Sequence, residues 1–247
     1  IDPSEIPNAG GRLPFSADVA DVVEEFRPPV VSFHFGLPDA DLLERVRSWG
    51  SIILASATTV NEGLWLEANG VDVVIAQGSE AGGHRGMFLS SDLTTQLGTF
   101  TLVPQLVEAL TVPVVAAGGI AIPSEVHAAH ALGAAGVQVG TAYLQCPEST
   151  ITDIHRSALR TDAVRHTVLT NLFTGRPARG MINRFIREFG PMSDAAPAFP
   201  LASAALAPVR ARAEQLGSGD FSPLWSGQHV VTSREMPAAD LTQLLCE

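Results

Sequence analysis

The stretch AQGSEAGGHRG, residues 76–86, holds the side chains best suited to chemistry. It directly follows the apolar run Val71–Ile75 and places His84 among glycines. Glycine accepts positive φ and lets a flat ligand approach the backbone closely, and an imidazole titrates in the range needed to take a proton from a weak carbon acid. Two interpretations stay open here: a general base on a ligand-binding loop, or a surface histidine beside Arg85.

Two further glycine turns follow apolar runs, AAGGI at residues 116–120 and VGTAY at residues 139–143. Backbone N–H groups in such turns, next to a helix N-terminus, bind phosphate. The candidate phosphate residues are Gly118, Gly119, Gly140 and Thr141. The alternative is tight packing of helix against strand, which also requires glycine.

Five short apolar runs are expected to be strands. Their hydrophobicity is nearly continuous, which is typical of parallel strands covered on both faces. Helical patterns lie between them: Thr59 and Glu62 form a capping box, and Pro104 and Pro123 are expected to open helices. Strand and helix alternate five times, which predicts an α/β fold with a parallel sheet. The runs are Val30–Gly36, Ile52–Thr58, Val71–Gly78, Val112–Gly119 and Gly136–Ala142.

The glycine turns favour a (β/α)8 TIM barrel over an open sheet. In such barrels phosphate sits on the loops after strands seven and eight. The five runs would then be strands four to eight, with strands one to three lacking from this chain and residues 1–15 forming a linker. Residues 1–147 are expected to form a partial TIM barrel, and residues 148–247 a C-terminal helical and loop extension over the barrel mouth. Within that extension, residues 170–185 are expected to be rich in loops.

Composition excludes several classes of protein. The 247 residues are 46% apolar and carry a formal net charge of −11, which argues against a nucleic-acid partner. No apolar run approaches the roughly 20 residues of a membrane span. Cys146 and Cys246 fit neither a zinc site nor a disulfide framework. We therefore expect no bound metal and a cytoplasmic location.

The stretches AQGSEAGGHRG, VPVVAAGGI and GVQVGTAYL, in this order and spacing, resemble the nitronate monooxygenase family of FMN-dependent TIM-barrel enzymes, formerly called 2-nitropropane dioxygenases. VVSFHFGLP, ILASATTV and NLFTGRPARG extend the likeness over nearly the whole chain. The Gln-x-Pro-Met-type stretch on the family's first strand has no counterpart here. The resemblance implies oxidation of alkyl nitronates, and of nitroalkanes, with O₂ to a carbonyl compound and nitrite. It implies small-molecule partners and allows a homodimer.

The resemblance also implies residue roles. His84 would be the catalytic base facing the flavin, and the four phosphate candidates would bind the FMN phosphate. Residues expected to line the flavin or its ribityl chain are Ser56, Ala57, Gln77, Gly82 and Gly83. His34 and Trp225 are weaker candidates for substrate contact, and Arg176 and Arg179 could reach an anionic group.

Two other functions remain open on sequence grounds. The first is an FMN-dependent NAD(P)H reductase of the enoyl-acyl-carrier-protein reductase or quinone reductase type, since these enzymes look similar in the same glycine motifs. The second is a non-catalytic, phosphate-binding barrel fragment that needs a partner chain.

Overall fold

A computed structural model describes residues 14–231 and 235–247 of the chain, so most of the linker expected at residues 1–15 lies outside it. Five parallel strands form the main sheet, each paired in register with the next, as in Val30 with Ile52 and Val74 with Val114. Their order across the sheet is β1-β2-β3-β5-β6. The strands are β1 (Val30–Phe33), β2 (Ile52–Ala57), β3 (Val73–Gln77), β5 (Val114–Ala117) and β6 (Gly136–Gln138).

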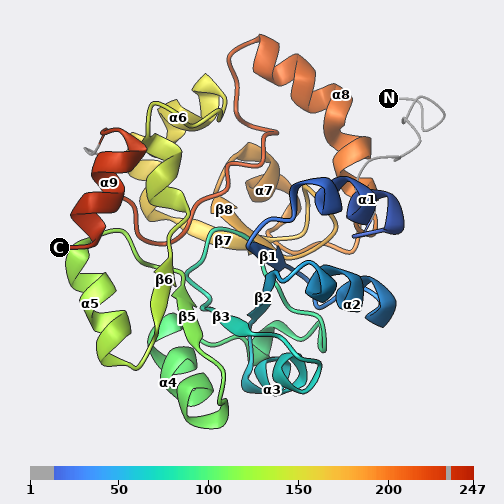
Figure 1. Cartoon of the computed structure of the whole chain (residues 1–247). Helices are drawn as coiled ribbons and strands as arrows, with labels where there is room; N and C mark the ends of the chain where they lie inside the picture. The colour runs from blue at the N-terminus through green and yellow to red at the C-terminus, as the bar shows by residue number, and fades with distance from the viewer. Residues whose placement is uncertain (1–13, 232–234) are drawn as a thin grey trace.

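The order of these strands across the sheet follows their order along the chain. A doubly wound sheet reverses its strand order at a switch point, and this sheet does not. Figure 1 shows the helices α2 to α5 arranged around the outside of the curved sheet. The predicted parallel α/β sheet is confirmed, and its winding proceeds in one direction.

Helices alternate with the strands and continue into the C-terminal part. Several begin at the residue types that favour a helix start: the hydroxyl of Thr59 accepts a hydrogen bond from the Glu62 amide, and Pro123 is the first residue of its helix, as predicted. The helices are α1 (Ala17–Phe26), α2 (Ala40–Ser48), α3 (Val60–Ala68), α4 (Thr99–Ala109), α5 (Pro123–Ala131), α6 (Asp153–Leu159), α7 (Arg184–Phe189), α8 (Leu201–Gln215) and α9 (Ala238–Leu245).

The predicted start of α4 at Pro104 is wrong, because the helix begins at Thr99 and contains the proline. The reason is a long-range cap. The carboxylate of Glu80, on the loop after β3, accepts hydrogen bonds from the Thr99 amide at 2.8 Å and from its hydroxyl at 3.0 Å. This cap satisfies an N–H group that the helix itself leaves unpaired.

A second, three-stranded antiparallel sheet packs beside the first (Figure 1), in the order β4-β8-β7. It joins β4 (Gly83–His84) to β7 (Thr167–Thr170) and β8 (Ala178–Met181). The expectation of a loop-rich segment at residues 170–185 is therefore wrong for β8 and for the start of α7. The reason is that β8 pairs over four residues with β7 and over two residues with β4, which lies almost a hundred residues earlier in the chain.

The main core lies between the parallel sheet and its helices. Small strand residues such as Ala55 and Ala116 are fully buried, and larger residues such as Leu66, Leu102 and Leu106 fill the helix side. None of the helices in the described ranges is both long and apolar enough to cross a membrane.

Candidate active site

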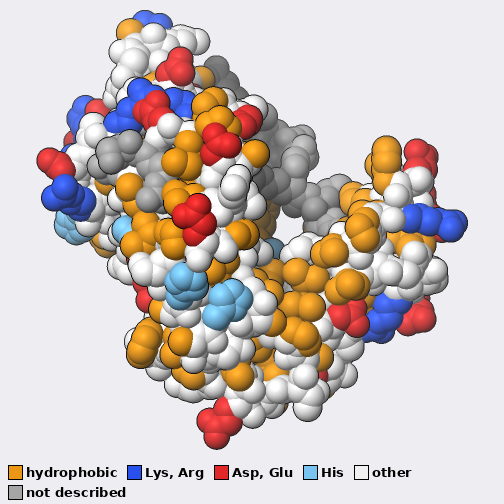
Figure 2. Space-filling model, turned by 60° about the vertical axis from the view of Figure 1, so that its left-hand side comes forward, with side chains coloured by type: hydrophobic (Ala, Val, Ile, Leu, Met, Phe, Trp, Pro, Cys, Tyr) orange, Lys and Arg blue, Asp and Glu red, His pale blue; other side chains and the backbone are white. Residues whose placement is uncertain are grey.

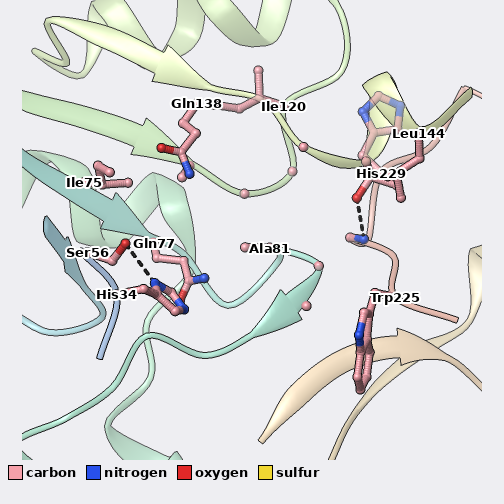
Figure 3. Close-up of a pocket in the computed structure, with 18 residues that line it drawn as sticks. His34, Ser56, Ile75, Gln77, Ala81, Ile120, Gln138, Leu144, Trp225 and His229 are labelled. Atoms are coloured by element: carbon pink, nitrogen blue, oxygen red, sulfur yellow. Dashed lines mark hydrogen bonds between the residues drawn. The ribbon is translucent and has the colours of Figure 1, made fainter. Parts of the chain in front are cut away.

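A cavity of about 270 Å³ opens where the parallel strands end (Figure 3). Carboxyl ends of parallel strands are where α/β proteins place their ligands. Its walls come from the ends of β2, β3, β5 and β6, from the loop after β3, and from the segment around Trp225. The lining residues are His34, Ser56, Ile75, Gln77, Ala81, Gly82, Gly83, Ala117, Gly118, Gly119, Ile120, Gln138, Gly140, Thr141, Leu144, Trp225, Gly227 and His229.

The structure brings most of the predicted site residues to this one cavity. Both glycine turns, the Gly82–Gly83 pair, Gln77, Ser56, His34 and Trp225 all line it. Four predicted residues do not. Ala57 is fully buried in the core, and the His84 ring lies 5.7 Å from the Trp225 ring between centroids. The Arg176 guanidinium lies over the Phe35 ring, and the Arg179 guanidinium donates to the Ser79 carbonyl at 2.7 Å.

The two glycine turns differ in the space beside them, since a Cβ atom on Gly118 would lie 2.9 Å from the Ala81 amide nitrogen. Gly118 and Gly119 adopt φ of 115° and 72°, a region that other residues rarely enter. A Cβ atom built on Gly140 meets nothing within 4 Å, so this turn faces open space. On the opposite wall, a Cβ atom on Gly82 would lie 2.5 Å from the Gly227 amide nitrogen, so this position has no room for a side chain. The cradle formed by these turns therefore has room, at Gly140, for an anion such as phosphate, which backbone amides bind.

His34 is the histidine that lines the cavity at the β1 end. Its Nδ1 lies 3.1 Å from Ser56 Oγ at the end of β2 (Figure 3). Burial lowers the pKa of this imidazole, while a hydrogen bond to the His84 carbonyl acts in the opposite direction. Desolvation therefore favours the neutral form of this imidazole.

His84 sits inside an aromatic cluster next to the cavity. Its ring contacts Phe35, Phe199 and Trp225 at centroid distances of 5.7, 5.8 and 5.7 Å. Its Nε2 lies 2.9 Å from the hydroxyl oxygen of Thr174. The guanidinium of Arg176 stacks over the Phe35 ring at 4.2 Å, so the cluster also contains a positive charge.

The backbone around His84 is fixed by Gln77. The side-chain amide of Gln77 donates from Nε2 to the His84 carbonyl at 2.9 Å, and its Oε1 accepts from the Gly86 backbone amide at 2.7 Å. The fully buried Arg85 holds the same region from behind, donating to the carbonyls of Gln77 at 2.7 Å and Gly78 at 2.6 Å. Burial lowers the pKa of Arg85 to about 10. The loop that carries His84 is therefore held in place by hydrogen bonds from the Gln77 and Arg85 side chains.

Several lining residues were not predicted from the sequence. Gln138 could have been found, because it is a polar side chain within the apolar strand β6. Gly227 and His229 were not identified, although Trp225 in the same segment was predicted to contact substrate. The part of the chain that the structure describes holds no group of three or more side chains able to bind a metal ion.

Two histidines with lowered pKa values predict how stability depends on pH. Burial lowers the pKa of His34 and of His155, whose Nε2 lies 2.9 Å from the Trp225 carbonyl oxygen. The unfolded chain binds protons on these imidazoles near the ordinary pKa of about 6.5, whereas the folded chain binds them only at lower pH. We therefore expect the free energy of unfolding to fall as the pH drops through about 6.5.

Urea unfolding at about pH 7.5 and about pH 5.5 measures this effect. His155→Gln should reduce the loss of stability between the two pH values, and His127→Gln, at an exposed position of α5, serves as the matched control. An unchanged pH dependence in His155→Gln would contradict the assignment.

The fold and the cavity together define an α/β protein with a glycine-lined cavity at the ends of its parallel strands. The family model described as nitronate monooxygenase matches residues 8–247. The chain therefore belongs to the nitronate monooxygenase family.

Individual relatives agree with this family. A nitronate monooxygenase of Paraburkholderia phytofirmans is 42% identical over 94% of this chain. A crystal structure of nitroalkane oxidase from Streptomyces ansochromogenes is 42% identical over 92% of this chain, with a TM-score of 0.86. FabK from Thermotoga maritima is 28% identical over 95% of the chain, with a TM-score of 0.77. The chain spans 64% of the Paraburkholderia relative and 66% of the Streptomyces one.

Proposed function

We propose that this protein oxidises alkyl nitronates, with FMN and O₂, to a carbonyl compound and nitrite. The observation that carries the proposal is the cavity itself. It joins two glycine turns suited to a phosphate with a wall that holds Gln77, Ser56 and His34, all at the ends of one parallel sheet. The five strands, wound in one direction, are proposed to be strands four to eight of a (β/α)8 barrel, with residues 148–247 as the extension over its mouth.

In this proposal each part of the cavity has one task. The amides at Gly118, Gly119 and Gly140, with the Thr141 hydroxyl, bind the phosphate. The Gly82–Gly83 pair and Gln77 lie along the flavin and ribityl chain, and Ser56, next to Ala57 at the end of β2, lies near the ring. FMN, when bound, supplies the electron acceptor between the nitronate and O₂.

The proton chemistry falls to the histidines. With a neutral nitroalkane, His84 removes the α-proton, and its protonated form then faces the nitronate anion. With a preformed nitronate no proton needs to be removed, so the imidazolium only stabilises the anion. Arg176 supports anion binding, because its guanidinium lies over the Phe35 ring that also contacts His84. We further propose a cytoplasmic location, since Cys146 and Cys246 are both unpaired.

The spectrum of the purified protein tests this function. We expect bound FMN, with its oxidised absorbance lost when an alkyl nitronate is added without O₂ and restored by air. A flavin that ignores nitronate and is bleached by NADH would support the second candidate instead, an NAD(P)H-dependent reductase. The chain is 28% identical to the FabK structure and 42% identical to the nitroalkane oxidase structure, so the likeness to FabK is the weaker one. Absence of flavin binding would contradict both.

A further inference from the structure

His229 lines the cavity together with the two glycine turns, and the proposed function gives it no role. It lies on the opposite side of the pocket from His34 (Figure 3). Its Nδ1 lies 2.6 Å from Glu125 Oε1 at the start of α5, and the ring is partly exposed. This orientation places Nε2 on the side of the ring away from Glu125.

The segment that carries His229 is anchored to both walls of the cavity. The Gly227 amide donates to the Thr141 hydroxyl at 2.9 Å, and the Gln228 amide donates to the Glu80 carbonyl at 2.9 Å. A second cavity shares Gly118, Gly119, Ile120 and His229 with the first. The imidazole therefore stands in a fixed position beside the turn proposed to bind phosphate.

The charges around this turn explain why an imidazole matters there. Besides His229, the titratable side chains lining the two cavities in the described residues are His34, Glu80 and Glu125. Both carboxylates cap helices: Glu80 accepts from Thr99, and Glu125 accepts from the Ala121 amide at 2.7 Å. The chain contains no lysine at all. Both carboxylates line the second cavity, so a phosphate dianion at this turn would lie near two acidic side chains. Among the described residues that line this second cavity, His229 is the one side chain that can carry a compensating positive charge.

We infer that His229, oriented by Glu125, contacts the phosphate group of the bound flavin and selects a phosphorylated flavin over an unphosphorylated one. A hydrogen bond from a charged donor to phosphate is stronger than one between neutral groups. The inference rests on the proposed function, because it assigns a phosphate-selecting residue to the same cofactor site. It adds a side chain to a cradle otherwise made of backbone amides and the Thr141 hydroxyl.

Titration of the flavin-free protein with FMN and with riboflavin, followed by flavin fluorescence, tests this inference. The two ligands differ only in the phosphate. We expect His229→Gln to weaken FMN binding about ten- to hundredfold, the size expected for one charged hydrogen bond, and to leave riboflavin binding unchanged. Inorganic phosphate should compete with FMN less effectively in the variant than in the original protein.

His127→Gln is the matched control. His127 and His130 are exposed on α5. Figure 2 shows one face of the molecule, on which histidine side chains are exposed. The control should keep the original preference for FMN. The same preference in His229→Gln would overturn the inference while leaving the proposed function intact. Failure of the original protein to bind either flavin would overturn the proposed function, and the inference with it.

Discussion

Replacing His84 with asparagine is expected to lower turnover of a neutral nitroalkane by about 10²- to 10⁴-fold, the usual contribution of a general base. Turnover of the preformed nitronate should fall much less, because that substrate has already lost its α-proton. Asparagine keeps a polar side chain next to the Thr174 hydroxyl, so the aromatic cluster around position 84 stays occupied. The measurement is kcat/KM for one nitroalkane and for its own nitronate, in the same FMN-loaded preparation.

The competing base is His34, because it lines the cavity and burial lowers its pKa. His34→Asn should therefore be assayed beside His84→Asn. A larger selective loss with the nitroalkane in His34→Asn would transfer the role of base to His34. Equal losses on both substrates in His84→Asn would contradict its assignment as a base. His127→Asn, at an exposed position on α5, controls for the loss of a histidine as such.

The parallel sheet could be predicted because each of its strands is marked by residues that are neighbours in the sequence. Each strand is a short apolar run, and each is closed by glycine or a polar residue, so every one of the five was identified. The glycine turns were identified for the same reason, since positive φ at Gly118 and Gly119 requires that residue type. Their convergence on one cavity then follows from the geometry of parallel strands.

The features that escaped prediction depend on residues far apart in the chain. Strand β4 has two residues and exists because Gly83 pairs with Arg179. The capping box at Thr59 formed only in part: the Thr59 hydroxyl caps α3, but the Glu62 carboxylate reaches to the amides of Thr58 and Phe88. His229 came to the site through anchoring of its neighbours to Thr141 and Glu80. Periodicity and spacing contain none of these contacts.

Arg85→Met is expected to lower the free energy of unfolding by about 3 kcal/mol or more. The guanidinium is fully buried and donates to the Gln77 carbonyl, the Gly78 carbonyl and the Gln96 side chain. Methionine fills a similar volume but leaves these acceptors buried without a donor, and each such group costs about 1–3 kcal/mol. Urea unfolding of the original protein and the variant measures the difference in free energy.

Arg165→Met is the control for Arg85→Met, because Arg165 is exposed and forms a surface ion pair with Asp162. Its effect should stay within about 0.5 kcal/mol. Arg85→Lys retains a positive charge without the planar fork, so its stability should fall between those of the original protein and Arg85→Met. Hydrogen exchange gives a second readout, since the Gly86 amide bonds to the Gln77 side chain and should exchange faster once Arg85 no longer holds Gln77. Normal stability and normal protection at Gly86 in Arg85→Met would show that the buried guanidinium does not position the His84 loop.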